Sequence, residues 1–420
     1  MKVANKKRIR KIGSCALLAV MTASFGIGGL TACNSGDSAS TDGEQQGFSS
    51  IIENVDIQRA KFYDENVVMK RDDTVKSNEE ITIIVKSQKK SLLDEYNDSK
   101  SMLSFTEYAV STRGQALARS IADHNSELMA RLKNIGISYD IGNTYDVLLS
   151  GFEVTVKAGD LATLKNALGS DVTTFVSEEY KAAEAQLVTN KVNVYDTGIF
   201  DSSDSKYQGN GVVVAVLDTG LDYTHSAFSM DTFKVNEAEL GLTKSKVQEK
   251  IANTKAYGST AGLTAEDVYM NARLPYGYDY ADKDPDVYPI ESEHGTHVSG
   301  VIVGKDNEIT GVAPNAQLVT MKVFSDVSSG ARTSWMLAAL EDCVTLGVDV
   351  INMSLGSSCG FTTEVDRKEV NEVYQKVMDA GISLVTAASN DYNATFGSEK
   401  NGNYPLTTNP DSGTVGSPST

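Results

Sequence analysis

The sequence has no long run of lysine or arginine beyond its extreme N-terminus, and acidic residues outnumber basic ones by 56 to 38. The formal net charge of -18 argues against a nucleic-acid partner and suits a soluble extracellular surface. No internal repeat of the solenoid type is present. With 420 residues, 40% of them apolar, the chain is long enough for two or three domains with a sizeable buried core.

The apolar stretch near the N-terminus, from about Cys15 to Leu30, is short for a membrane span. It follows a basic segment between Lys2 and Lys11, an order typical of an export signal. The stretch closes with Leu30-Thr31-Ala32-Cys33, which resembles a bacterial lipobox, and this resemblance implies that the Cys33 thiol receives a diacylglyceryl group. We expect residues 1–33 to be a lipoprotein signal, with the mature protein anchored at the extracellular face of the bacterial cell membrane or envelope. The alternative is a plain secretory signal in which Cys33 has no such role.

Cysteine is scarce, with four residues in the chain. Cys15 lies within the expected signal and Cys33 at its end, so only Cys343 and Cys359 remain for the folded part. One falls on a predicted helix and the other in a Gly/Ser loop, and no positive signal favours a disulfide between them. We expect two free, partly buried thiols.

Residues 34–50 are mostly serine, glycine, aspartate, threonine, glutamate and glutamine, too polar to offset the entropy of ordering. Apolar positions between residues 51 and 78 follow no clear period. We therefore predict that residues 34–79 comprise a flexible tether and a segment to which we assign no function.

Residues 80–187 contain strand, helix, strand, strand, helix and strand patterns, the order of a ferredoxin-like α+β unit. The predicted strands are Ile81–Val85, Ile135–Ile141, Phe152–Val156 and Val172–Val176. The predicted helices are Gln115–Lys133 and a shorter one that begins after the cap Asp160 and stops at Gly169. A polar, helix-prone link, Lys181 to Gln186, follows.

Residues 188–420 alternate buried strands with helices, which predicts a doubly wound α/β domain with right-handed crossovers. The apolar runs predict strands at Gly211–Leu217, Gln317–Phe324, Val348–Met353 and Ile382–Ala387. The helices are predicted at His297–Val303, Thr333–Leu346 and Arg367–Asp379.

Polar residues that could carry chemistry follow the predicted strands, at the edge where parallel sheets bind ligands. These segments are Asp218-Thr219-Gly220, Ser354-Leu355-Gly356 and Ala388-Ser389-Asn390. A further segment, His294-Gly295-Thr296-His297-Val298-Ser299-Gly300, opens a helix. Histidine can accept and return a proton near neutrality because its unperturbed pKa is about 6.5.

Together these motifs resemble the subtilisin-like serine peptidases, the subtilase family, and among them the large cell-envelope proteinases. The resemblance implies that Asp218 orients the imidazole, that His294 is the general base and that Asn390 donates to the oxyanion. It further implies that Ser354, Leu355 and Gly356 bind an extended substrate, that Gly295 and Gly300 allow close packing, and that His297 faces the helix interior. Gly151-Phe152-Glu153-Val154 and the short helix after it resemble the family's propeptide, so residues 80–187 are expected to inhibit the enzyme intramolecularly.

Two metal hypotheses compete with this interpretation. A site made of His294, His297 and a carboxylate is disfavoured because zinc-binding pairs lie four residues apart with an intervening glutamate. The alternation Asp282, Asp284, Asp286 with Glu293 resembles a calcium loop, but Val287 stands where such a loop needs glycine and Pro285 stiffens it. The acidic position that helps bind calcium in many relatives falls near Ala227. We predict no metal site, and structural calcium stays an open alternative.

The family's nucleophile lies in a segment of the Gly-Thr-Ser-Met-Ala type, which these 420 residues lack. Ser417 and Ser419 do not have the required helical context. We expect a serine endopeptidase acting on proteins or peptides, with the nucleophile encoded downstream, so that this chain alone is inactive. The alternative is a non-catalytic surface binding protein derived from a subtilase.

Overall fold

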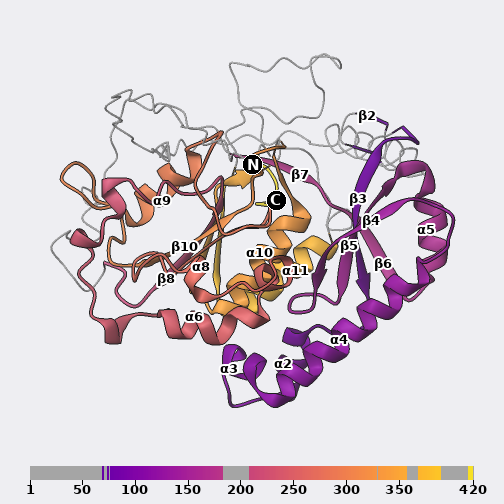
Figure 1. Ribbon diagram of the computed structural model, residues 1–420, viewed down its shortest axis with the longest axis horizontal. Helices are drawn as coiled ribbons and strands as arrows, with labels where there is room; N and C mark the ends of the chain where they lie inside the picture. The colour runs from indigo at the N-terminus through magenta and orange to yellow at the C-terminus, as the bar shows by residue number, and fades with distance from the viewer. Residues whose placement is uncertain are drawn as a thin grey trace, which may run out of the picture.

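The computed structural model describes the backbone of residues 69–70 and 73–74, and residues 76–182, 208–328, 330–356, 368–388 and 415–419 in full. The predicted signal with Cys33, most of the tether, Cys359 and Asn390 lie outside these residues. No helix within the described ranges has both the length and the apolarity that crossing a membrane requires. Two units are visible in Figure 1, an N-terminal one in purple and a larger one in pink to orange.

The N-terminal unit is ferredoxin-like, as predicted. Its four antiparallel strands follow the order β4-β5-β3-β6 in the sheet. One face of the sheet is covered by α4 and α5, whose leucines, among them Leu128 and Leu164, form an apolar core with Ile83 and Val154. The strands are β3 (Glu80–Ser87), β4 (Tyr139–Tyr145), β5 (Gly151–Lys157) and β6 (Val172–Val176), and the helices are α4 (Thr112–Arg131) and α5 (Leu161–Leu168).

Two local expectations in this unit were wrong, and one feature was not predicted. The weak strand lies at Tyr139–Tyr145 instead of Ile135–Ile141, because buried Asn143 donates its side-chain amide to Glu153 Oε2 at 3.0 Å on the neighbouring strand. Asp160 makes no side-chain cap to α5. The first crossover holds two unpredicted helices, α2 (Leu92–Ser99) and α3 (Phe105–Val110), each begun by a capping box. A two-stranded ribbon, β1 (Met69–Lys70) and β2 (Asp73–Thr74), precedes the unit.

The larger unit is the predicted doubly wound parallel α/β domain. Its five-stranded sheet has the order β14-β12-β8-β10-β9, and all its strand pairs are parallel. Helix α9 packs on one face, and α10 and α11 pack on the other. The strands are β8 (Val213–Asp218), β9 (Tyr276–Asp279), β10 (Gln317–Lys322), β12 (Val350–Met353) and β14 (Ser383–Thr386). The main helices are α9 (His294–Val303), α10 (Thr333–Leu346) and α11 (Lys368–Asp379).

Strand β9 and the short helices near it were not predicted, because their stretches are too short to show a clear period. The short α-helices are α6 (Lys244–Lys250), α7 (Lys255–Ser259) and α8 (Ala265–Val268). Single 3₁₀ turns occur at η1 (Ala158–Asp160), η4 (Ser226–Phe228), η5 (Met230–Thr232), η6 (Glu237–Glu239) and η7 (Ile251–Asn253).

A strand from the N-terminal unit enters the larger one. Strand β7 (Glu179–Ala182) lies antiparallel between β11 (Ala331–Arg332) and β13 (Leu355–Gly356). The helix-prone reading of the Lys181–Gln186 link was therefore wrong for its described part, Lys181 and Ala182. This segment forms a strand despite its local helix propensity, because the edges of β11 and β13 offer backbone hydrogen bonds that an isolated short helix lacks.

The two units share a core along α10, all of whose residues are buried. Glu341 of this helix is 0% exposed, and its carboxylate accepts the backbone N–H groups of Asp146 at 3.2 Å, Val147 at 2.9 Å and Leu148 at 2.7 Å. Lys255 Nζ lies 3.2 Å from the same carboxylate and also pairs with Asp146. A buried charge is tolerated only with such partners, so Glu341 ties the α/β domain to the loop between β4 and β5.

Candidate active site

Asp218 and His294 meet at the carboxyl edge of the parallel sheet. Asp218 is the last residue of β8, His294 is the first residue of α9, and His294 Nδ1 lies 2.8 Å from Asp218 Oδ1. Asp218 is 1% exposed and the His294 side chain 8% exposed. Because an ionised carboxylate can only accept, the proton of this hydrogen bond belongs to Nδ1, which leaves Nε2 free to act as a base.

Thr219 holds the two segments together, a role that the sequence did not reveal. Its backbone N–H donates to Asp218 Oδ1 at 2.7 Å, and its hydroxyl donates to the carbonyl of Ser292 at 2.9 Å. The same hydroxyl accepts the N–H of Gly295 at 2.9 Å. The start of α9 is thus bound directly to the residue that follows the aspartate.

One of the two predicted glycines is required for this approach. A Cβ on Gly295 would lie 2.3 Å from the carbonyl oxygen of Gly220, which is closer than atoms pack. Gly220 itself has φ +113°, a conformation that favours glycine. The expectation for Gly300 was wrong in this respect, because the nearest atom to a Cβ there is 4.0 Å away.

The environment of His294 favours its protonated form. Burial alone would lower the pKa of the imidazole, but the hydrogen bond and the charge of Asp218 outweigh it and raise the pKa above the usual value. Burial, helped by the nearby charge of His294, lowers the pKa of His297. His297 Nδ1 is buried and has no hydrogen-bond partner among the described residues.

The predicted substrate segment lies beside β7. Leu355 pairs with Ala182 and Gly356 with Lys181, while Ser354 Oγ accepts from Asn352 Nδ2 at 3.0 Å. A Cβ on Gly356 would stand 2.8 Å from the carbonyl oxygen of Ser417, so this glycine admits the segment 415–419.

The strand on the other side of β7, β11, was not predicted. Ala331 of β11 pairs with Tyr180, and the guanidinium of Arg332 lies 4.8 Å from the ring centre of Trp335. The two residues of β11 are too few to show a strand pattern, so only the tertiary structure identifies them.

The remaining site predictions are placed only in part. Asn390 lies outside the described residues, but the chain leading to it is held at the sheet edge, where Ala387 N–H donates to the Met353 carbonyl at 3.1 Å. Cys343 is a buried free thiol. In the part of the chain that the structure describes, one group of carboxylates could hold a metal ion, made of Asp279, Asp282 and Asp326. Two of its members, Asp279 and Asp326, were not singled out from the sequence.

An imidazole held by a buried carboxylate at the carboxyl edge of a doubly wound sheet is the acid–base arrangement of triad hydrolases. The subtilase family profile matches residues 209–420, half of the sequence, and the chain belongs to that family. Its curated relatives include the PI-type proteinase of Lactococcus lactis subsp. cremoris, 35% identical over 260 residues, and the C5a peptidase of Streptococcus pyogenes serotype M6, 34% identical over 221 residues. These alignments cover 59% and 50% of this chain, but only 12% and 17% of the relatives.

Solved structures of similar fold include fervidolysin from Fervidobacterium pennivorans, with a TM-score of 0.42 and 15% identity over 77% of this chain and 41% of that one. Another is the epidermin leader peptide processing protease of Staphylococcus aureus, with a TM-score of 0.44 and 14% identity over 77% and 63%.

We expect the Asp218→Asn substitution to lower the pKa of His294, because it removes the charge that offsets burial. Imidazole titration by NMR measures this, with Asp222→Asn, which alters a nearby turn, as the matched control. Since the folded pKa of His294 is raised, the stability it contributes is fully present below the unfolded pKa of about 6.5 and is lost as the pH rises through the folded value. An unchanged His294 titration in Asp218→Asn would contradict the assignment.

Proposed function

We propose that this chain is the N-terminal part of an exported serine endopeptidase with an Asp–His–Ser triad, whose nucleophile follows the residues printed here. The observation that carries the proposal is the 2.8 Å hydrogen bond between buried Asp218 and His294 at the sheet edge. Membership of the subtilase family supports the same reaction class.

In the proposed reaction His294 Nε2 takes the proton of the serine hydroxyl as that oxygen attacks the peptide carbonyl carbon. Asp218 keeps the imidazole in the correct tautomer and stabilises its charged form, which the raised pKa of His294 favours. The same nitrogen then returns the proton to the leaving amine as the C–N bond breaks, and a water molecule activated by His294 hydrolyses the remaining ester and restores the serine. Asn390 donates its side-chain amide to the oxyanion in this scheme.

Strand β7 supports both the substrate site and the inhibitory role of residues 80–187. An extended segment of this chain already pairs with β11 and β13, and the buried Tyr180 side chain is 1% exposed between them. The chain runs from Tyr180 towards Ala182, opposite Leu355, and therefore towards the end of β12, which neighbours β8 and Asp218 in the sheet. A substrate bound in the same way would present its peptide bond to the catalytic pair.

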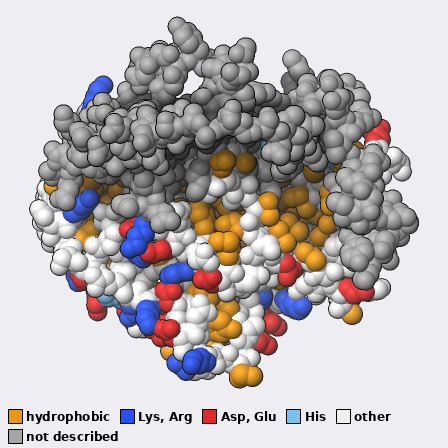
Figure 2. Space-filling view, turned by 180° about the vertical axis from the view of Figure 1, so that it is seen from behind, with side chains coloured by type: hydrophobic (Ala, Val, Ile, Leu, Met, Phe, Trp, Pro, Cys, Tyr) orange, Lys and Arg blue, Asp and Glu red, His pale blue; other side chains and the backbone are white. Residues whose placement is uncertain are grey.

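The binding partners that we propose follow from the reaction class and from the net charge of the chain. Proteins or peptides are the substrates, and a nucleic-acid partner is disfavoured by the net charge of -18. Figure 2 agrees with this, because acidic and basic side chains are interspersed on the described part of the face it shows.

We expect the protein extended to its natural end to hydrolyse an unstructured protein, and serine-directed sulfonyl fluorides to block this. His294→Ala should cost about as much activity as removing the nucleophile, since triad residues act as a unit. Asn390→Ala should lower kcat by about 10²–10³-fold with little change in KM, the effect known for this donor in subtilisin itself. His225→Ala, which removes a histidine outside the proposed triad, is the control. Activity that survives both the inhibitor and His294→Ala would refute the serine mechanism. A complete absence of peptidase activity in the extended protein would favour a binding protein.

Inhibition by the N-terminal unit is tested with two glutamates that contact it. Glu341→Ala in the mature enzyme should weaken inhibition by added residues 76–182 by about 2–5 kcal/mol, because the backbone N–H groups of residues 146–149 lose their acceptor. Across the interface, Glu372→Ala removes the partly exposed pair with Lys86 and should cost about 0–1 kcal/mol. The measurement is the inhibition constant, and equal effects of the two changes would contradict this account of the interface.

We further propose that Cys33 anchors the mature protein in the membrane, since a diacylglyceryl group supplies two acyl chains. Cys33→Ala should release the protein into the medium and abolish labelling by a radioactive fatty acid, whereas Cys343→Ala should change neither. Equal membrane retention of the Cys33 variant would exclude this anchor.

A further inference from the structure

Calcium is the metal that the sequence left open, and the segment around Ala227 is the first place to test the fit. Ala227 offers only its carbonyl oxygen, which already accepts the N–H of Lys305 at 2.8 Å. The neighbouring carboxylate, Asp306, accepts from the Ser226 hydroxyl at 2.7 Å and from the backbone N–H groups of Glu308 and Ile309 at 2.8 and 3.0 Å. These oxygens are directed at protein donors, so the segment does not fit a calcium ion.

A protein cation joins the same segments. The guanidinium of Arg273, 0% exposed, donates to the carbonyl of Ser229 at 2.9 Å, to the hydroxyl of Thr232 at 3.1 Å and to the carbonyl of Val303 at the end of α9. Burial lowers the pKa of Arg273 to about 10, which still leaves it charged at neutral pH. It also faces the negative end of the helix that begins with His294.

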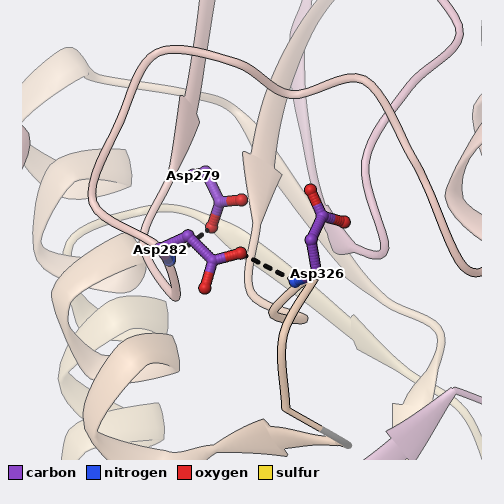
Figure 3. A group of neighbouring side chains, drawn as sticks. All are labelled: Asp279, Asp282 and Asp326. Atoms are coloured by element: carbon purple, nitrogen blue, oxygen red, sulfur yellow. Dashed lines mark hydrogen bonds between the residues drawn. The ribbon is translucent and has the colours of Figure 1, made fainter. Parts of the chain in front are cut away.

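The second place is the carboxylate group in Figure 3. Asp279 ends β9, Asp282 follows in the next turn, and Asp326 lies in the loop after β10. One oxygen from each lies within 4.8 Å of the others, a spacing that calcium, with ligand distances of about 2.3–2.6 Å, could bridge.

An ammonium group already occupies this group of carboxylates. Lys322 is 1% exposed, hydrogen-bonds to Asp279 Oδ2, and holds its Nζ 3.0 Å from Asp326 Oδ2 and 4.0 Å from Asp282 Oδ2. Because a metal ion bound by the same oxygens would be pressed against this nitrogen, lysine and calcium exclude each other. The side chains of Asp282 and Asp326 are less buried, with 21% and 23% exposed.

The other contacts of these carboxylates fix them around the lysine. Asp279 Oδ1 accepts the N–H groups of Ala281 and Asp282, both at 2.9 Å. Asp282 accepts the Ser325 hydroxyl at 2.6 Å and the Asp326 N–H at 2.7 Å, and Figure 3 shows the latter bond. Hydrogen bonds from protein donors therefore hold the carboxylates of Asp279 and Asp282 in place around Lys322.

Lys322 also stands next to the catalytic strand. In the sheet it pairs with Asp218 of β8 on one side and with Asp279 of β9 on the other. The N–H of Val323, the next residue, donates to the Asp218 carbonyl at 3.0 Å. A shift of Lys322 would therefore move the backbone that positions Asp218.

We propose that the α/β domain uses its own cations, Lys322 and Arg273, in place of structural calcium at these two positions. The lysine joins the edge strand β9 to the strand beside Asp218, and the arginine joins the segment 226–232 to the end of α9. Stability at both positions is then independent of calcium.

The test is thermal unfolding of the full chain in calcium chloride and in EGTA. Calcium bound elsewhere would shift the wild-type melting temperature as well, so each variant is compared with the wild type in the same solution. Lys322→Met should melt about 10 °C lower in EGTA, because three carboxylates lose their cation, and calcium should restore part of the loss. Lys322→Arg keeps the charge and should be destabilised less than Lys322→Met. A Lys322→Met variant as stable in EGTA as the wild type would overturn the proposal.

A second variant decides the question even where Lys322→Met does not fold. Asp326→Asn removes one carboxylate and leaves the Lys322–Asp279 pair, and calcium bound at equilibrium is counted by dialysis. The proposal requires the same number of bound ions in Asp326→Asn and in the wild type, wherever else an ion binds. Loss of one calcium ion in Asp326→Asn would show that the group holds a metal and would overturn the proposal.

Discussion

The parallel pairing of β10, β8 and β12 is the constraint on which the candidate site depends. These strands run in register, so their carboxyl ends reach one edge of the sheet together. Every residue of β8 is buried, and hence the only polar side chain it can carry at low cost is one with partners at the strand end. Asp218 has such partners in the N–H of Thr219 and the imidazole of His294.

The N-terminal unit completes the surface of the α/β domain. Helix α10 has no exposed face in this structure, although it carries two adjacent acidic residues, Glu341 and Asp342. Asp342 accepts the hydroxyl of Tyr280 at 2.7 Å and the backbone N–H groups that begin α7, and burial raises its pKa to about 7. Glu341 takes its backbone donors from the other unit, so the contact that covers α10 also satisfies this carboxylate. A separation of the units would return that carboxylate to water.

Burial decides the role of charge elsewhere in the domain as well. Lys322, Arg273 and Glu341 are almost fully enclosed, and each lies against several oxygen or N–H partners from segments distant in the sequence. Such groups stabilise a fold only when all partners are present, since a lone buried charge is strongly destabilising. They therefore link loops that apolar contacts alone would leave poorly determined.

The sequence determined the strands, helices and motifs whose cause is local. Periodicity predicted the ferredoxin-like order, the buried strand before Asp218 and the helix Thr333–Leu346, which the structure has with the same bounds. Strand ends also predicted that Asp218 lies at the carboxyl edge of the sheet, because parallel strands align their carboxyl ends. Composition and spacing were sufficient for these features, since each depends on neighbours within a few residues.

Tertiary structure alone decided the features that depend on distant partners. Strand β7 forms only because β11 and β13 offer open edges, and Thr219 acquires its role only when α9 docks against β8. The lysine among Asp279, Asp282 and Asp326 has the same origin, as its carboxylates come from segments more than 40 residues apart. Hydrogen bonds and charges act through short distances in space, and a linear pattern does not record those distances.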